Sequence, residues 1–193
     1  MSTYNLVHPH GELTGNDVMI DYLDDNLRRL KRYLESVDDE CLHWLIDPES
    51  ISIATILWHM GRILDVFFTQ LALGYPSKKE CWIAGGWVEK TGYDPRGLGR
   101  DGWGSLNEYT LEEVAAMPKL SKEQYVNFLE NVYDTVRAYL KSTPMSELAK
   151  PGAGFEGKYT CYQVISMALM DNVRHLGEIR LIKSLWVRAQ PES

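Results

Sequence analysis

The chain has 193 residues, of which 45% are hydrophobic and 24% are charged, and its formal net charge is −7 at pH 7. These values are typical of a soluble globular protein that buries a core of its own. The acidic balance argues against nucleic acid as the main partner, because that binding needs clustered lysine and arginine. We therefore expect a single domain over 1–193, with its core at about 15–187 and no nucleic-acid partner.

The cysteines and the N-terminus predict a compartment. Cys41, Cys81 and Cys161 are far apart and odd in number, which fits reduced thiols better than a disulfide framework. The first residues lack the basic start and apolar run of a signal peptide. The longest charge-free stretches, such as 66–77, are too short to span a bilayer. We expect a cytoplasmic protein that does not bind a membrane.

Four segments carry apolar residues at alternating spacings of three and four, which is the period of an amphipathic helix. In chain order they cover about 15–38, 52–73, 121–141 and 160–187. The third and fourth begin with the capping boxes "SKEQ" and "TCYQ". Four such helices with two long connections predict an all-α fold, a four-helix bundle.

The connection between the second and third helices, residues 74–120, is unusually rich in tryptophan and glycine. Its stretch 81–104 alone holds seven of the 15 glycines and three of the six tryptophans. Loops of this length are usually functional or disordered, and the aromatic content argues against disorder. A short helix is predicted at 110–117, which opens with its own Thr–x–x–Glu box.

Three polar residues lie on helix faces that should be apolar. Asp171 and His175 are four residues apart, so they stand about 40° apart around the fourth helix. Val164 and Ile182 fall between them on the same apolar stripe. On the second helix, His59 lies about 40° from Ile63 at the edge of another such stripe. Facing helices of a bundle bring such side chains together.

Two interpretations of these residues stay open on spacing alone. In the first, His59, Asp171 and His175 share one divalent ion, which offsets the cost of burying a carboxylate. Nitrogen and oxygen ligands suit zinc, nickel, iron and manganese, and three protein ligands leave positions for water or substrate. In the second, Asp171 and His175 form a hydrogen bond within one helix, and His59 is a satisfied core histidine.

The order of the motifs resembles that of DinB-like proteins. "SISIATILWHMGRILDVFF" resembles their second helix, in which a histidine follows an apolar run. "MALMDNVRHLGEIRLIKSL" resembles their last helix, in which a ligand and a histidine are separated by three residues. "IAGGWVEKTGYDPRGLG" and "TLEEVAAM" resemble the connection found in one branch of that superfamily.

The resemblance implies a metal-binding four-helix bundle, usually dimeric, related to YfiT-like hydrolases and thiol-dependent S-transferases. Carried over residue by residue, it implies His59, Asp171 and His175 as the metal ligands. The middle ligand is commonly histidine in that family, so Asp171 is a departure from its pattern. The resemblance further implies a low-molecular-weight thiol as a cofactor and a small-molecule substrate.

Four aromatic residues of the connection can line an apolar pocket over the metal, or they only fix the loop to the bundle. They are Trp82, Trp87, Tyr93 and Trp103. Three weaker candidates are His8 and His10, which can bind metal, and Cys161, which opens a helix where a thiol pKa can fall. We expect Cys161 to be a small buried hydrophobe instead.

The sequence thus supports two hypotheses of different class. The first is a metal-dependent enzyme that hydrolyses a small molecule or transfers a small thiol to an electrophile. The alternative is a non-catalytic dimeric bundle that binds a metal or a small ligand as a sensor or interaction module.

Overall fold

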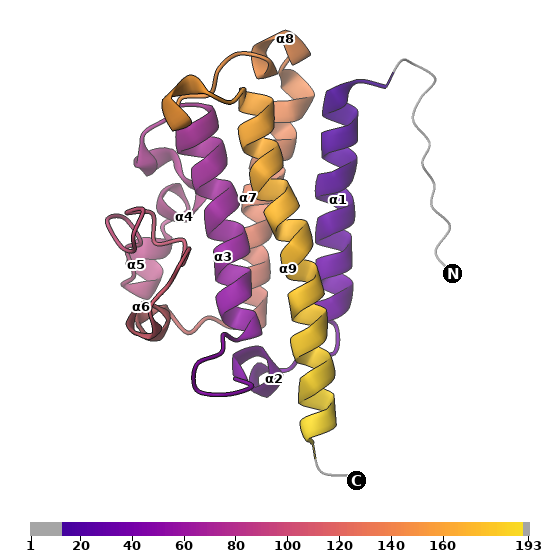
Figure 1. The fold of residues 1–193 in the computed structure, drawn as a ribbon, viewed down its shortest axis with the longest axis vertical. Helices are drawn as coiled ribbons and strands as arrows, with labels where there is room; N and C mark the ends of the chain where they lie inside the picture. The colour runs from indigo at the N-terminus through magenta and orange to yellow at the C-terminus, as the bar shows by residue number, and fades with distance from the viewer. Residues whose placement is uncertain (1–12, 191–193) are drawn as a thin grey trace.

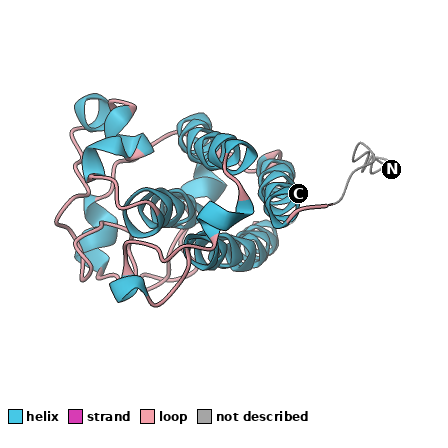
Figure 2. Cartoon of the chain, turned by 90° about the horizontal axis from the view of Figure 1, so that it is seen from above, coloured by secondary structure: helices cyan, strands magenta, loops and turns pink. Residues whose placement is uncertain are grey.

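Four long helices that lie side by side dominate residues 13–190, the part of the chain that this computed structural model describes (Figure 1; Figure 2). They are α1 (Gly15–Leu34), α3 (Ile53–Val66), α7 (Lys122–Ser142) and α9 (Cys161–Ala189). Helices α1 and α3 each pack against both α7 and α9. The all-α fold predicted from the sequence is confirmed, since residues 13–190 form no strand and one isolated β-bridge joins Pro151 to Thr160.

Shorter helical elements connect the long ones. They are α2 (Asp39–His43), the π-helical η1 (Phe67–Ala72), the 3₁₀-helical η2 (Ser77–Lys79), α4 (Cys81–Ala84), α5 (Trp87–Thr91), α6 (Leu111–Ala116), α8 (Met145–Leu148) and the 3₁₀-helical η3 (Phe155–Gly157). In Figure 1 the 74–120 connection, with α4, α5 and α6, lies along the outer side of α3. Helix α4 packs against both α3 and α7, so the connection covers the bundle rather than extending from it.

Side-chain caps fix where several helices begin. Capping boxes start α6, α7 and α9, as their sequences predict, and a further box joins Thr14 to Asp17 at the start of α1. In each box the cap side chain accepts a hydrogen bond from a backbone N–H that has no partner within the helix. The box at Thr160 fixes the start of α9 at Cys161, and packing of α9 against α3 directs Asp171 toward His59.

Two predicted helix boundaries differ from the structure. The segment 15–38 was expected as one helix, but α1 ends at Leu34 and Val37 is buried in the turn that follows. The Nζ of Lys122 donates to the carbonyl oxygens of Leu34 and Val37 at 3.3 and 2.7 Å, and Asp38 caps a new helix, α2. The predicted 52–73 helix continues, but it changes from α to π hydrogen bonding at Phe67.

The core of the bundle runs along the inner faces of the four long helices. Gly61 of α3 permits a close approach, since a Cβ atom there would lie 2.6 Å from a ring carbon of Phe128 on α7. The fully buried Trp58 stacks on the same Phe128 ring, with 5.9 Å between ring centroids. No helix within residues 13–190 combines the length and the apolar character that crossing a membrane requires.

Candidate metal centre

The three predicted ligands meet at the seam between α3 and α9. His59 comes from the middle of α3, and Asp171 and His175 come from successive turns of α9. The side chains are largely buried, with exposed fractions of 14% for His59, 21% for Asp171 and 10% for His175. Because α3 and α9 pack directly against each other, residues 112 positions apart in sequence become neighbours.

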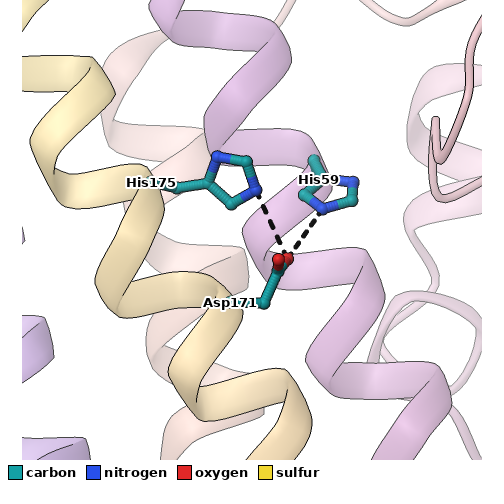
Figure 3. Close-up of side chains that lie close together, drawn as sticks. All are labelled: His59, Asp171 and His175. Atoms are coloured by element: carbon teal, nitrogen blue, oxygen red, sulfur yellow. Dashed lines mark hydrogen bonds and ion pairs between the residues drawn. The ribbon is translucent and has the colours of Figure 1, made fainter.

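Both imidazole rings present their Nε2 atom to one carboxylate oxygen (Figure 3). The Nε2 of His59 lies 2.9 Å from Asp171 Oδ2, and the Nε2 of His175 lies 3.3 Å from the same atom. The ring centroids are 4.8 Å apart with the planes at 75°. One candidate ligand atom from each residue falls within 4.8 Å of the other two.

The opposite nitrogen of each ring is held by an acceptor. The Nδ1 of His59 lies 2.6 Å from the carbonyl oxygen of Ser105, which can only accept a hydrogen bond. The Nδ1 of His175 lies 2.6 Å from Oε2 of Glu178. Both contacts require the proton on Nδ1, which leaves the Nε2 lone pair of a neutral ring pointing at Asp171. Metal-bound histidines are commonly oriented by this kind of outer partner.

This arrangement needs a positive charge at its centre. Two Nε2 lone pairs and a carboxylate oxygen are all acceptors, and acceptors that face one another in a buried site repel unless a cation lies between them. The buried Nε2 of His175 has no hydrogen-bond partner within residues 13–190, although it lies near Asp171. Protons can supply the charge, and so can a divalent ion, which suits two imidazole nitrogens and a carboxylate oxygen. The residues present therefore fit a metal ion.

A comparison with models of known protein families shows which family this chain belongs to. A model described as the DinB superfamily matches residues 22–179, a span that includes all three candidate ligands. The chain belongs to the DinB superfamily. The resemblance drawn from the two histidine-bearing helices is thereby confirmed.

Solved structures agree with this DinB fold. A conserved protein from Enterococcus faecalis aligns with a TM-score of 0.71 at 18% identity, covering 90% of this chain and 98% of the other. A protein from Streptococcus pneumoniae aligns with a TM-score of 0.58 at 14% identity, covering 92% and 93% of the two chains. At such low identities the likeness concerns the fold alone. No curated protein matches the chain.

The electrostatics of the DinB site favour a negative Asp171 beside positive charge. Burial raises the pKa of Asp171, but His175 and His59, which attract its carboxylate when their rings are protonated, outweigh burial and hold that pKa well below its usual range. Burial lowers the pKa of His175, yet its partners Asp171 and Glu178 raise the pKa above the ordinary value. The exposed Arg174 also pairs with Asp171, through Oδ1. The carboxylate is thus prepared to neutralise a cation placed between the rings.

Three of the four aromatic residues of the connection belong to one cluster with Trp58, and Trp103 packs elsewhere. Trp82 is fully buried, stacks on Trp87 and meets Trp58 edge-on at 4.6 Å. Because Trp58 precedes His59 by one residue, this cluster lies about 100° around α3 from the metal face. These contacts fix the loop to the bundle, and a role for the tryptophans in lining a pocket stays a prediction.

Tyr93 belongs to the Trp58 cluster, since its ring lies edge-on to Trp58 at 5.3 Å, whereas Trp103 lies two residues before Ser105, whose carbonyl oxygen accepts from His59. Tyr93 lines a cavity of about 210 Å³ together with Gly104 and Leu106, the two neighbours of Ser105. Trp103 packs edge-on against Phe67, with 5.8 Å between ring centroids. The loop residue that bonds to a ligand ring, Ser105, therefore passes directly beside a small apolar cavity.

The weaker candidates have separate outcomes. His8 and His10 lie outside the described residues. Cys161 is buried, with its Sγ 3.2 Å from the carbonyl oxygen of Ala72. Burial raises the pKa of this thiol, so the helix start does not activate it as a nucleophile.

Two residues of the site were not singled out from the sequence. Glu178 follows His175 by three positions, a spacing that places it on the same side of the helix, so a signal for it existed. Ser105 acts through its backbone carbonyl, which every residue carries, so the sequence held no signal for it.

Proposed function

We propose that this DinB protein is a metal-dependent enzyme that acts on a small molecule, by hydrolysis or by transfer of a low-molecular-weight thiol to an electrophile. His59, Asp171 and His175 hold the ion, for which zinc, nickel, iron and manganese are the candidates. The observation that carries the proposal is the convergence of two Nε2 lone pairs on one carboxylate oxygen, with both Nδ1 atoms held by other acceptors. The bound ion would lower the pKa of a water or thiol bound to it toward neutrality.

The chain's own residues supply orientation and charge. Ser105 and Glu178 hold the two rings, and Asp171 contributes the negative charge. Three protein ligands leave room for water or substrate, which is typical of catalytic rather than structural sites. The cavity of about 210 Å³ beside Ser105 is a candidate position for the apolar part of a small substrate.

The proposal is tested by measuring metal content and activity in sequence. Protein purified without an affinity tag is analysed for bound metals, and the loaded protein is then screened with small thiols and electrophiles and with simple esters and amides. We expect close to one ion per chain and a turnover that His59→Ala removes. His43→Ala is the matched control, because His43 is an exposed histidine at the end of α2. Protein that retains no metal and gains none on dialysis against each candidate ion would contradict the proposal.

One observation favours the non-catalytic alternative. The charged side chains next to the ligands are already engaged, Arg174 with Asp171 and Glu178 with His175. A site whose neighbours serve the ligands is suited to a metal or ligand sensor as well as to catalysis. Metal binding with no turnover in the screen would favour this alternative.

We further propose that the protein is a cytoplasmic homodimer. Cys41, Cys81 and Cys161 are all free, which agrees with a reducing compartment. An exposed apolar stripe on α9 supports self-association: Met170 is 65% exposed, Val173 44% and Leu181 58%. A Cβ atom at Gly177, within that stripe, would meet nothing within 4 Å, so another helix can approach closely there. A monomer in sedimentation at micromolar concentration would contradict the dimer.

A further inference from the structure

Three consecutive backbone carbonyls of the long connection accept hydrogen bonds from side chains of α3. The Nε of Arg62 donates to the carbonyl oxygen of Trp103 at 2.7 Å. The Nε1 of Trp58 donates to that of Gly104 at 2.9 Å, and the Nδ1 of His59 donates to that of Ser105 at 2.6 Å. We name residues 103–105 the carbonyl strap. Its position on α3 is therefore set at three successive points, one of which is a candidate metal ligand.

A group of buried charged side chains holds Arg62, the donor to the carbonyl oxygen of Trp103, in place. Arg62, Asp65 and Glu80 all have exposed fractions of 0%. Besides Trp103, the guanidinium of Arg62 contacts Oε2 of Glu80 through Nη1 at 2.6 Å, and Gln70 binds the other oxygen of that carboxylate.

Asp65 belongs to the same group, but it acts on a different segment. Its two carboxylate oxygens accept hydrogen bonds from the backbone N–H groups of Cys81 and Trp82, at 2.8 and 3.0 Å. Asp65 therefore fixes the start of α4, whereas Arg62 reaches the strap directly. Asp65 Oδ2 also lies 3.8 Å from Nη1 of Arg62, farther than the 2.6 Å between that nitrogen and Glu80.

The backbone at and directly after the strap takes conformations that residues with a side chain rarely adopt. Gly104 has φ +61°, and a Cβ atom there would lie 2.5 Å from the carbonyl oxygen of Pro95. Leu106, directly after the strap, also has a positive φ of 63°, which is uncommon for a residue with a side chain. Conformations of this kind persist only where the surroundings impose them. The three α3 donors hold this segment together with a backbone hydrogen bond from the N–H of Gly104 to the carbonyl oxygen of Leu98 at 2.8 Å.

Stability alone does not explain the buried charges. Removing charged groups from water costs free energy that their mutual attraction often fails to recover, so a buried ion pair is weak evidence for stabilisation. The buried Nη2 of Arg62 also has no hydrogen-bond partner within residues 13–190. A group that is costly and incompletely satisfied is better explained by what it positions.

We propose that Arg62 is a positioning residue for His59. Arg62 fixes the carbonyl of Trp103, the strap carries that position two residues along to the carbonyl of Ser105, and Ser105 keeps the proton of His59 on Nδ1. The Nε2 lone pair of His59 then faces Asp171. The meaning of this arrangement for metal binding rests on the proposed function, whereas the position of the proton is a property of the metal-free protein.

The test uses the full chain, stripped of metal, at a pH at which the NMR spectra show neutral imidazole rings. Long-range ¹H–¹⁵N correlation spectra report which ring nitrogen of His59 carries the proton. The main variant is Arg62→Lys, which retains a buried positive charge for Glu80 but lacks the fork that reaches Trp103 at the same time. We expect the wild type to show the Nδ1–H form and Arg62→Lys to show a mixture with the Nε2–H form.

Two further variants separate positioning from general loosening. Asp65→Asn perturbs the same buried charges at the start of α4, and we expect it to leave the His59 proton on Nδ1. Trp58→Phe removes the middle contact of the strap without changing any charge, and we expect the same mixture as for Arg62→Lys. It replaces Arg62→Lys as the decisive variant if the lysine variant does not fold.

A second readout connects the proton position to the metal. We expect Arg62→Lys to weaken zinc binding by about tenfold or more, as loss of an outer partner usually does, and Asp65→Asn to leave zinc binding within about twofold. A His59 proton that stays on Nδ1 in both strap variants overturns the proposal, and so does an equal change in Asp65→Asn. A third outcome separates the two proposals. If the His59 proton moves in the variants as expected, but neither the wild type nor any variant binds metal, the proposed function fails and the positioning role of Arg62 stands.

Discussion

Asp171 and Asn172 are neighbours on α9, yet they belong to two polar groups of opposite character. Asp171 faces α3 and meets two imidazole rings. Asn172 faces the inside of the bundle, where its Nδ2 donates to the hydroxyl of Tyr133 at 3.0 Å, and that hydroxyl donates to Asn26 Oδ1 at 2.5 Å. The second group joins α9, α7 and α1, and its three side chains are at most 3% exposed.

The two groups offset the free-energy cost of burying polar atoms in different ways. The neutral group joins its side chains through the Tyr133 hydroxyl, which both gives and receives a hydrogen bond, although Asn26 Nδ2 and Asn172 Oδ1 have no partner within residues 13–190. The charged group places acceptors against an acceptor, so its balance depends on protons or on an ion from outside. The neutral group therefore serves the alignment of three helices, while the charged group is left dependent on a cation.

The largest expected effect concerns the neutral group. Tyr133→Phe removes its central hydroxyl and leaves Asn26 and Asn172 buried without their partner, which should lower the free energy of unfolding by about 3 kcal/mol. Chemical denaturation in urea measures this loss. The increase in melting temperature on adding zinc should be unchanged, because the two groups share no side chain. A smaller metal response in this variant would mean that the groups are coupled.

The next effect concerns the charged group. An ion that binds only the folded protein stabilises it by about 2.7 kcal/mol when its free concentration is a hundredfold above the dissociation constant. Thermal melting should therefore fall in chelator and recover with zinc, nickel or manganese. His59→Ala should abolish the response, and His43→Ala should retain it. Equal melting of the metal-free and metal-loaded proteins would leave His59, Asp171 and His175 as a polar contact between α3 and α9 that binds no metal.

The metal response should depend on pH. The pKa of His175 is raised, so in the metal-free protein its stabilisation is fully present below the unfolded pKa of about 6.5 and is lost as pH rises through the folded pKa. Metal must displace that proton to bind. The free energy by which metal stabilises the fold should therefore grow by up to about 1.4 kcal/mol per pH unit per proton, until pH passes the folded pKa of His175.

The titration of Asp171 does not change the stability of the protein over the pH range in which His175 loses its proton. The pKa of Asp171 is lowered, so its stabilisation is present above the unfolded pKa of about 3.9 and is lost only as pH falls through the depressed folded value. Melting curves with and without zinc, recorded from acid to neutral pH, measure the difference. A metal contribution that is constant across this range would exclude His175 as a ligand.

The smallest effect concerns the outer partner of His175. In Glu178→Gln the amide oxygen can still accept from Nδ1, but the negative charge that helps to raise the pKa of His175 is lost. We expect the pKa of His175 to fall by less than about one unit and zinc affinity to change by less than about tenfold. An NMR titration and competition with a coloured chelator measure the two quantities. Glu147→Gln, at an exposed ion pair remote in sequence, is the matched control.

The sequence predicted the elements that depend on periodicity. Apolar spacing and capping boxes located the four long helices, and the angle between Asp171 and His175 placed both on a buried face. It overextended the first helix, because the turn after Leu34 is fixed by Lys122, a residue 88 positions away. It did not indicate Ser105 or the pairing of Arg62 with Glu80, since those contacts depend on the path of the connection. The ligand set itself stays a prediction until a metal is measured.

The carbonyl strap also determines how its own residues and their donors are restricted. The strap is held through main-chain oxygen atoms, so within it only Gly104 is restricted by its own backbone, and the side chains of Trp103 and Ser105 take no part in those three hydrogen bonds. The side chains that these hydrogen bonds require are the donors Trp58, His59 and Arg62, which lie within little more than one turn of α3. The side chains at positions 103 and 105 are restricted by their packing instead, since Ser105 is 3% exposed and Trp103 packs against Phe67.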